Sequence, residues 1–170
     1  ALVGVYNGLS IVDVTDPENP AEVFFGPGPE SIWRDIKTWG DYAYVSNETG
    51  DGIYIVDLSP LPGGSITNTT NFTGSLYPFS NSHNLYIDES GKLYIFGANS
   101  GSGGAIICDL TADPMNPVEL GRFDAFYLHD GMARGDTLWG AGIYQGVLAA
   151  IDVSSPSNPV IMGTVSTPSQ

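Results

Sequence analysis

Short hydrophobic runs recur along the chain, and each ends in the same polar signal. The four runs begin at Gly8, Gly52, Gly104 and Gly146 and read GLSIVD, GIYIVD, GAIICD and GVLAAID. After each aspartate come an aliphatic residue, a Ser or Thr, and a proline-rich turn. Runs of this length that start at glycine and are rich in Val, Ile and Tyr predict β-strands.

The four aspartates set a repeat length. They are Asp13, Asp57, Asp109 and Asp152, with spacings of 44, 52 and 43 residues. A period of about 40–50 residues occurs in propellers and in helical repeat arrays. The strand-forming composition of the runs favours the propeller.

A second pattern recurs between these runs. The segments WRDIKTWGDYAYV, SHNLYIDESGKLYIF and LHDGMARGDTLWGAG begin at Trp33, Ser82 and Leu128. Each predicts a strand, a tight glycine turn and a second strand. Gly40-Asp41 and Gly135-Asp136 are hairpin dipeptides, and Gly91-Lys92 takes that place after a two-residue insertion.

Together the patterns predict an all-β fold of four-stranded antiparallel propeller blades. Because both faces of a blade pack on neighbours, its central strands are apolar throughout. We expect one propeller segment over residues 1–170, about three and a half blades of a larger ring. The predicted units are a partial blade at 1–31, which lacks its inner strand, and blades at 32–81, 82–127 and 128–170. The outer strand of the second unit, within 65–74, is the least regular.

An incomplete ring implies partners. A closed propeller has about four to eight blades, and an open arc exposes blade faces and strand edges. We therefore expect the remaining blades to come from the same or another chain. The sequence opens in mid-pattern with ALVGVYN, so we also expect a piece of a longer or processed protein.

Composition narrows the classes of partner. Gly 22 and Pro 12 in 170 residues suit many turns and few helices. The net charge of −14 repels nucleic acid and anionic membrane surfaces. No apolar run approaches the roughly 18 residues of a membrane span, so we expect no membrane insertion. The one cysteine, Cys108, lies in the run AIIC and is expected to be a buried core thiol.

The aligned blade openings supply the candidate ligand-binding site. Three dipeptides fall at equivalent positions, namely Arg34-Asp35, His83-Asn84 and His129-Asp130. Because inner strands surround the axis of a propeller, these residues are expected to meet at the mouth of its channel. They can close the ring through Arg–Asp pairs, bind an anion, or perform acid–base chemistry. His83, His129 and Asp130 can instead hold a divalent metal.

Sequence motifs of catalysis do not accompany this cluster. We find no GxSxG elbow, HExxH, EF-hand loop or phosphate-binding GxGxxG, and we assign no catalytic residue. Three N-glycosylation sequons begin at Asn47, Asn68 and Asn71. The last two lie in a Thr- and Asn-rich stretch that should be exposed, which makes them the better candidates.

The segments IVDVTDPENP and AIDVSSPSNP, with the openings WRDIK, SHNLYID and LHDG, carry a family resemblance. The chain resembles the LVIVD-repeat propellers and, among them, the choice-of-anchor B family of secreted or surface-tethered proteins. The resemblance covers nearly all of the chain. It implies a β-propeller exported from the cell, and it brings no established catalytic activity.

Three functions remain open. The first is a non-enzymatic extracellular or cell-surface module for binding, adhesion or assembly, with a protein or glycan partner. The second is a hydrolase-like or lyase-like enzyme with its site at the channel mouth. The third is a structural subunit of an extracellular filament or coat.

Overall fold

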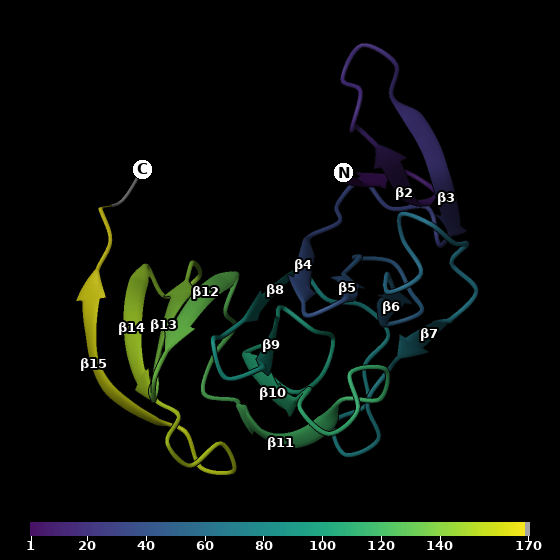
Figure 1. Cartoon of the computed structure of the whole chain (residues 1–170). Helices are drawn as coiled ribbons and strands as arrows, with labels where there is room; N and C mark the ends of the chain where they lie inside the picture. The colour runs from purple at the N-terminus through teal and green to yellow at the C-terminus, as the bar shows by residue number, and fades with distance from the viewer. Residues whose placement is uncertain (169–170) are drawn as a thin grey trace.

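The computed structural model describes residues 1–168, and all of its regular structure is β-strand. Figure 1 shows the chain from end to end. Within residues 1–168 there is no helix, and therefore none of the length and hydropathy that would cross a membrane. The strands are β1 (Leu2–Val5), β2 (Gly8–Asp13), β3 (Ala21–Pro27), β4 (Ile36–Trp39), β5 (Tyr42–Val45), β6 (Ile53–Asp57), β7 (Thr69–Phe72), β8 (Asn84–Ile87), β9 (Lys92–Phe96), β10 (Ala105–Asp109), β11 (Val118–Phe123), β12 (Asp130–Arg134), β13 (Thr137–Gly142), β14 (Val147–Asp152) and β15 (Val160–Ser166).

The strands form four antiparallel sheets in which sequence neighbours are always paired. The first sheet has three strands, β1 to β3, and the other three have four strands each, β4–β7, β8–β11 and β12–β15. We call these sheets blades one to four. Each blade lies within one of the four segments predicted from sequence. The fourth predicted segment, 128–170, includes residues 169 and 170, which fall outside the described residues. The all-β, four-stranded blade architecture is confirmed.

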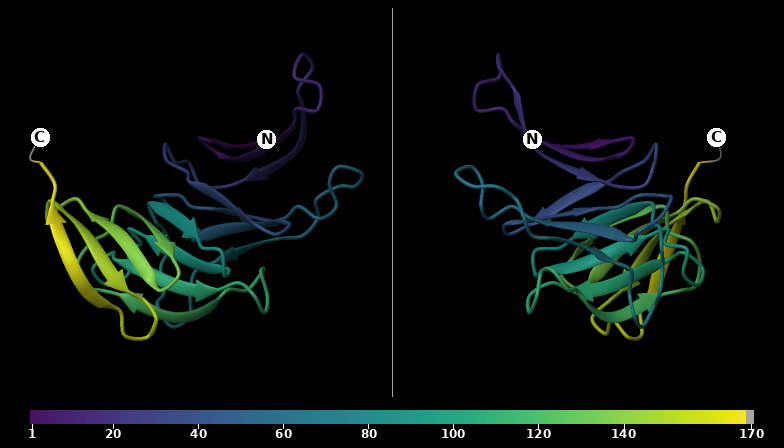
Figure 2. Two further views of the ribbon diagram at one scale, coloured as in Figure 1. Left: turned by 60° about the vertical axis from the view of Figure 1, so that its left-hand side comes forward. Right: turned by 90° about the vertical axis from the view of Figure 1, so that its right-hand side faces the viewer.

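Figure 1 looks along the axis around which the blades are arranged. The inner strands β4, β8 and β12 lie toward the axis, and the outer strands β7, β11 and β15 lie at the rim. Blade one has no strand at the inner position, so one edge of β1 is open. The four blades fill one side of a ring and leave the other side open, as the two views of Figure 2 also show.

The hairpin turns fix the register of the inner strands. In blades two and four, Trp39 pairs with Tyr42 and Arg134 with Thr137, which leaves the two-residue turns predicted from sequence. Gly40 and Gly135 adopt positive φ angles of 54° and 55°, which such turns require.

Blade three differs from the prediction in its turn. Lys92 is already the first residue of β9, so Gly91-Lys92 is not the turn dipeptide. A longer turn takes its place, closed by the Gly91 amide on the Asp88 carbonyl at 3.1 Å. The Asp88 carboxylate holds this turn, since it accepts the Ser90 and Lys92 amides at 2.9 Å each.

The outer strand of blade two also departs from the pattern. The regular strand β7 is confined to four residues, Thr69–Phe72, and it follows a long connection from the end of β6 at Asp57. The boundaries of this irregular strand could not be placed from sequence because its segment lacks the hydrophobic run of the other outer strands.

In every blade the repeated aspartate ends the strand next to the outer strand, and it makes the same hydrogen bond there. Its carboxylate accepts the amide of the Ser or Thr two residues on, at 2.8 Å for Asp13, 2.9 Å for Asp57, 2.7 Å for Asp109 and 2.9 Å for Asp152. Hydrogen bonds from the hydroxyl and amide of that residue lower the pKa of all four carboxyls. The recurring pattern of Asp, one aliphatic residue and then Ser or Thr therefore marks an Asx-type turn.

The core lies between blades, in three hydrophobic clusters. Leu9 and Ile11 of blade one meet Val45 and Val56 of blade two in the first cluster. The other two clusters join blades two and three, and blades three and four. Cys108 is fully buried in the second cluster, and burial raises the pKa of its thiol. The predicted core thiol is confirmed.

Polar contacts join blades two and three outside the core. The Glu119 carboxylate, on β11, accepts the amides of Ser75, Leu76 and Tyr77 at 2.7, 2.8 and 2.8 Å. Burial alone would raise the pKa of Glu119, but these amide hydrogen bonds outweigh it and the pKa is lowered. An ionised carboxylate thus links the rims of two blades.

We predict that Asp109→Ala lowers the melting temperature by about 2–4 °C at pH 7, because it removes a charge-assisted hydrogen bond worth about 1 kcal/mol. The folded-state pKa of Asp109 lies below its ordinary value, so this stabilisation is complete above roughly pH 4 and is lost as the pH falls through the folded-state pKa. Asp109→Asn keeps an acceptor and serves as the matched control. Melting curves at pH 7 and pH 2 measure both variants. An equal loss for Asp109→Ala at the two pH values would contradict this role.

Candidate functional site

Strand register places the three predicted dipeptides at equivalent positions. Ile36 pairs with Val45, Leu85 with Ile95 and Gly131 with Gly140, and these pairs occupy the same place in blades two, three and four. The residues just before them, 34–35, 83–84 and 129–130, therefore lie at the starts of the three inner strands, at equivalent positions in the three blades.

The two histidines lie against each other and extend an aromatic stack. The ring centroids of His83 and His129 are 4.0 Å apart, with an interplanar angle of 48°. On its other side His83 stacks on Trp33, at 4.8 Å and only 7° from parallel. Trp33 remains 42% exposed, so the stack Trp33–His83–His129 presents an aromatic surface from three successive blades.

A carboxylate that the sequence did not reveal orients His83. The Glu48 Oε1 atom lies 2.7 Å from His83 Nδ1. The Glu48 side chain is 44% exposed, and the His83 side chain is 12% exposed. A carboxylate accepts hydrogen bonds, so Nδ1 carries the proton. The other ring nitrogen, Nε2, is buried and has no partner within the described residues. In the neutral ring this leaves an unused acceptor at the centre of the stack.

The backbone around His83 is equally well fixed. The His83 carbonyl accepts the Trp33 indole N–H at 2.8 Å and the Ser46 hydroxyl at 3.2 Å. Gly97 permits this packing at a positive φ of 61°, because a Cβ there would lie 2.8 Å from the His83 Cβ. The stack is therefore held by hydrogen bonds between blades rather than by side-chain packing alone.

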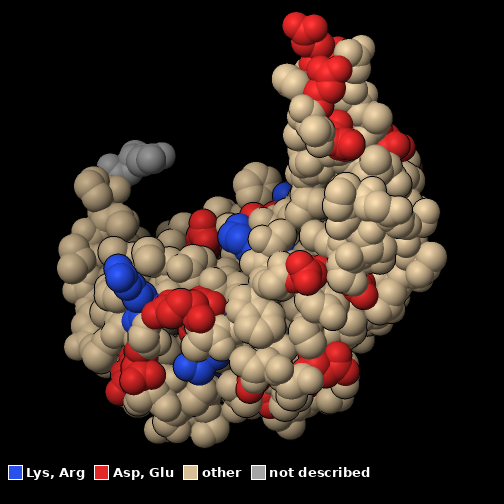
Figure 3. Space-filling view, viewed as in Figure 1, with Lys and Arg blue, Asp and Glu red and all other residues tan. Residues whose placement is uncertain are grey.

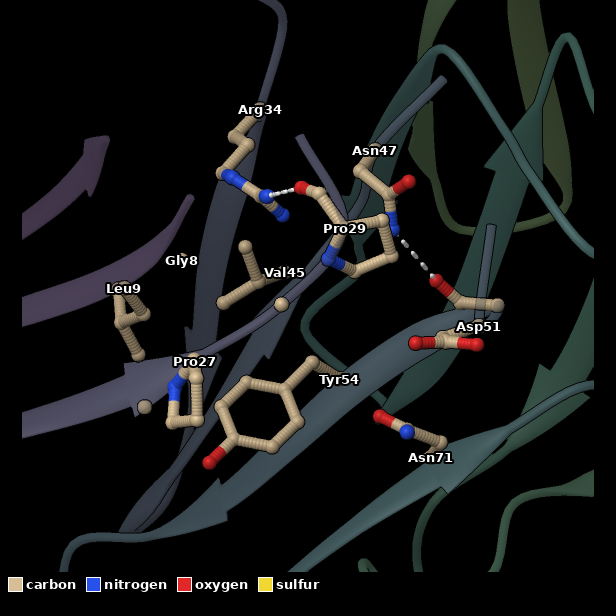
Figure 4. A pocket seen from close by; sticks show the side chains of 13 residues that line it. Gly8, Leu9, Pro27, Pro29, Arg34, Val45, Asn47, Asp51, Tyr54 and Asn71 are labelled. Atoms are coloured by element: carbon tan, nitrogen blue, oxygen red, sulfur yellow. Dashed lines mark hydrogen bonds between the residues drawn. The ribbon is translucent and has the colours of Figure 1, made fainter. Parts of the chain in front are cut away.

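Arg34 corrects one prediction, because it pairs with no carboxylate among residues 1–168. Its Nε donates to the Val5 carbonyl at 2.8 Å, and its Nη2 donates to the carbonyls of Tyr6, at 3.4 Å, and Pro29. Figure 4 shows the guanidinium turned toward Pro29 at the junction of blades one and two. Burial lowers the pKa of Arg34 from its ordinary value, yet an arginine stays protonated at neutral pH.

This part of the junction is closely packed. The cavity that Figure 4 draws measures only about 20 Å³, and its lining includes Arg34, Asn47 and Tyr54. Backbone carbonyl groups, in place of Asp35 or Asp130, accept the hydrogen bonds of the Arg34 guanidinium, because the chain from β3 to β4 wraps around it. Arg34 therefore joins blade one to blade two.

The second residue of each of the three dipeptides accepts a hydrogen bond from a backbone amide. Asp35 forms an ion pair with Lys37 at 2.6 Å and accepts the Leu85 amide at 3.0 Å, which joins blade two to blade three. Asn84 accepts the same amide at 2.8 Å, and Asp130 accepts the Gly131 amide at 2.7 Å. All three side chains thus shape the starts of inner strands.

Within residues 1–168, no group of three or more His, Cys, Asp or Glu side chains is arranged to hold a metal ion. The predicted set of His83, His129 and Asp130 is not brought together as such a group. The carboxylate that meets His83 is Glu48, and Asp130 faces its own backbone.

Further aromatic side chains surround the stack. Tyr127 and the exposed Tyr144 have ring centroids 4.9 Å apart. Burial, and after it the neighbouring Tyr144 and Glu48, raise the pKa of the Tyr127 hydroxyl. On the side of blade one, the exposed Tyr6 donates to Glu30 at 3.1 Å. A hollow of about 250 Å³ there is lined by residues that include Tyr6, Ser31 and Ile32.

Sequence reasoning missed Trp33, Glu48 and Tyr144 as residues of this site. For Trp33 a signal existed, because the equivalent positions in the next two blades carry Ser82 and Leu128. A tryptophan is out of place in that series. Glu48 lies in a loop, and nothing in its sequence neighbourhood indicates that it reaches the next blade.

The sequons differ in accessibility. Asn47 is only 2% exposed, and its amide nitrogen donates to the carbonyls of Gly50, at 2.7 Å, and Gly52, at 3.3 Å. Asn68 and Asn71 are exposed on the outer strand region of blade two. A folded-state glycan is thus compatible with Asn68 and Asn71 and not with Asn47.

Comparison with known families agrees with the repeat architecture. The model of the LVIVD repeat matches residues 1–25, 33–61 and 143–167. These ranges hold β1, β2 and most of β3 in blade one, β4 to β6 of blade two, and β14 and β15 of blade four. No curated protein matches the chain. The chain is therefore a propeller-like repeat protein with three segments similar to the LVIVD repeat.

Proposed function

We propose that the chain is a non-enzymatic binding module of an extracellular or cell-surface propeller, and that it takes a neutral, hydroxyl-rich ligand of the glycan class at the channel mouth. The observation that carries the proposal is the stack Trp33–His83–His129, in which Trp33 is 42% exposed and Glu48 holds the central ring.

The chemistry of the stack fits sugars. Aromatic faces pack against the apolar C–H faces of sugar rings, while nearby acceptors bind hydroxyl groups. Glu48, whose side chain is 44% exposed, supplies carboxylate oxygens that accept hydrogen bonds from hydroxyl groups. The half-exposed Trp33 gives the flat surface.

Charge argues against an anionic ligand. The chain carries a net charge of −14, and Figure 3 shows acidic side chains spread over the face in view, with a group at the projecting tip of blade one. Such a field lowers the local concentration of anions. Arg34, the cation nearest to the cluster in sequence, is held by carbonyl groups of the first interblade junction.

The enzyme alternative has less support. It needs Arg34 and Asp130 beside the histidines, but Arg34 donates to three carbonyls and Asp130 accepts its neighbouring amide. The contacts of Glu48 and His83 fix the ring in one orientation, which suits recognition.

The extracellular location and the choice-of-anchor B relationship remain part of the proposal. Their support is the resemblance of the blade openings and turns to that family. The exposed sequons at Asn68 and Asn71 are compatible with export.

We predict binding to neutral oligosaccharides on an array that carries neutral, sialylated and sulfated glycans. The best neutral glycan is then titrated calorimetrically. Trp33→Ala should weaken this affinity by about 10-fold or more, because it removes the stacking surface. His83→Phe keeps an aromatic ring in the stack but loses the hydrogen bond to Glu48 that orients it, and should also weaken binding.

The control is Leu76→Ala, which removes an exposed hydrophobic side chain on the rim of blade two. It should bind as the parent does, and circular dichroism should show the parent β-spectrum for all variants. Binding restricted to anionic glycans, or unchanged binding by Trp33→Ala, would refute the proposed ligand class.

We predict a second outcome for the chain when it is secreted from a eukaryotic host. Mass spectrometry of glycopeptides should find glycans at Asn68 or Asn71 and none at Asn47, whose amide nitrogen is already engaged in two hydrogen bonds. The variant Asn68→Gln/Asn71→Gln should then migrate as the unmodified chain. Occupancy at Asn47 in the folded protein would contradict the structure.

A further inference from the structure

A second pair of stacked aromatic rings lies on the blade-four side of the candidate site. Tyr127 is in the connection between blades three and four, and Tyr144 is on the turn between β13 and β14. Their ring centroids are 4.9 Å apart, with an interplanar angle of 41°. Tyr127 is half-buried, whereas Tyr144 is 75% exposed, so the pair presents an open ring to solvent.

Tyr127 joins this pair to the stack of the candidate site. A Cβ built on Gly97 would lie 2.8 Å from the His83 Cβ and 2.9 Å from the Tyr127 hydroxyl oxygen. Glycine at this position therefore lets the two side chains lie beside each other. Aromatic rings continue in this way from Trp33 through His83 and Tyr127 to Tyr144, across blades two, three and four.

Hydrogen-bonding groups accompany the middle of this series. Burial raises the pKa of the Tyr127 hydroxyl, and the neighbouring Tyr144 and Glu48 add to the shift. The hydroxyl therefore stays protonated at neutral pH and can donate as well as accept. The half-exposed Glu48 carboxylate accepts only. Together they match sugar hydroxyl groups, which both accept and donate.

The turn that carries Tyr144 is of a kind that stays exposed inside the arc. The corresponding turns of blades two and three are residues 46–52 and 97–104. Each has a following blade against it, yet Glu48 on the first turn and Gly101 and Ser102 on the second remain exposed. We therefore expect Tyr144 to stay accessible when another blade follows blade four.

We propose that the site binds an oligosaccharide, with one sugar ring stacked on Trp33 and another on Tyr144. This inference rests on the proposed function and adds a second subsite to it. The rings of His83 and Tyr127 lie between the two subsites, so a single sugar ring cannot cover both. Sugar units between the subsites lie over Glu48 and the Tyr127 hydroxyl. Two stacking contacts on one chain bind more tightly than either contact alone, because the second is made within the complex.

The test is calorimetric titration with β-glucan, α-glucan and mannan oligosaccharides, each from the single sugar to the hexasaccharide. Affinity should rise by about 10-fold or more along the binding series and level off once a chain reaches both subsites. Tyr144→Ala should reduce the affinity for long chains to that for short ones and leave the affinity for the single sugar unchanged. Tyr144→Phe keeps the ring and should bind as the parent does.

Tyr6→Ala is the matched control, since Tyr6 is an exposed tyrosine on the corresponding turn of blade one. It should change the affinity for no chain, and circular dichroism should show the parent β-spectrum for every variant. Equal affinity for the single sugar and the hexasaccharide would overturn this inference alone, as would long chains whose affinity survives Tyr144→Ala. If no neutral saccharide binds, the proposed function fails together with it.

Discussion

Burial of sheet faces against neighbouring sheets is the constraint on which this structure depends. A single four-stranded sheet of about five-residue strands is too small to bury its own side chains, so each blade gains its core only from the blade before and the blade after. Tyr44, Ile53 and Ile55 on one face and Val45 and Val56 on the other are all essentially inaccessible to solvent. The same requirement explains the hydrophobic runs that lack alternation, the fixed turns, and the exposed apolar faces at both ends of the arc.

The cluster of side chains at the starts of the inner strands is a consequence of this stacking. The inner strands of successive blades begin at equivalent positions, and their first side chains meet across blade boundaries. The stack Trp33–His83–His129 takes one residue from each of three blades, and Glu48 orients its central ring. Arg34 and Asp35 serve the same boundaries through carbonyl and amide groups. The residues that join the blades therefore also shape the candidate site.

Repetition made the fold predictable and left side-chain directions open. Four aspartates and two hairpin dipeptides indicated the blades and most of their strands, because the same aspartate hydrogen bond recurs in each unit. The same alignment brought His83 and His129 to one place. The partner of Arg34 was mispredicted because the wrap of residues 28–34 around it is not repeated in other blades. Glu48 was missed for a similar reason, since its contact with His83 depends on how two blades pack.

Hydrogen–deuterium exchange of the intact chain tests most directly whether stability comes from burial between blades. Amides in β9 and β10, whose blade is covered on both faces, should exchange most slowly. Amides in β15, whose side chains are exposed along its whole length, should exchange much faster. Exchange of β9 and β10 at the rate of β15 would show that the blades are stable without their neighbours and would contradict the account.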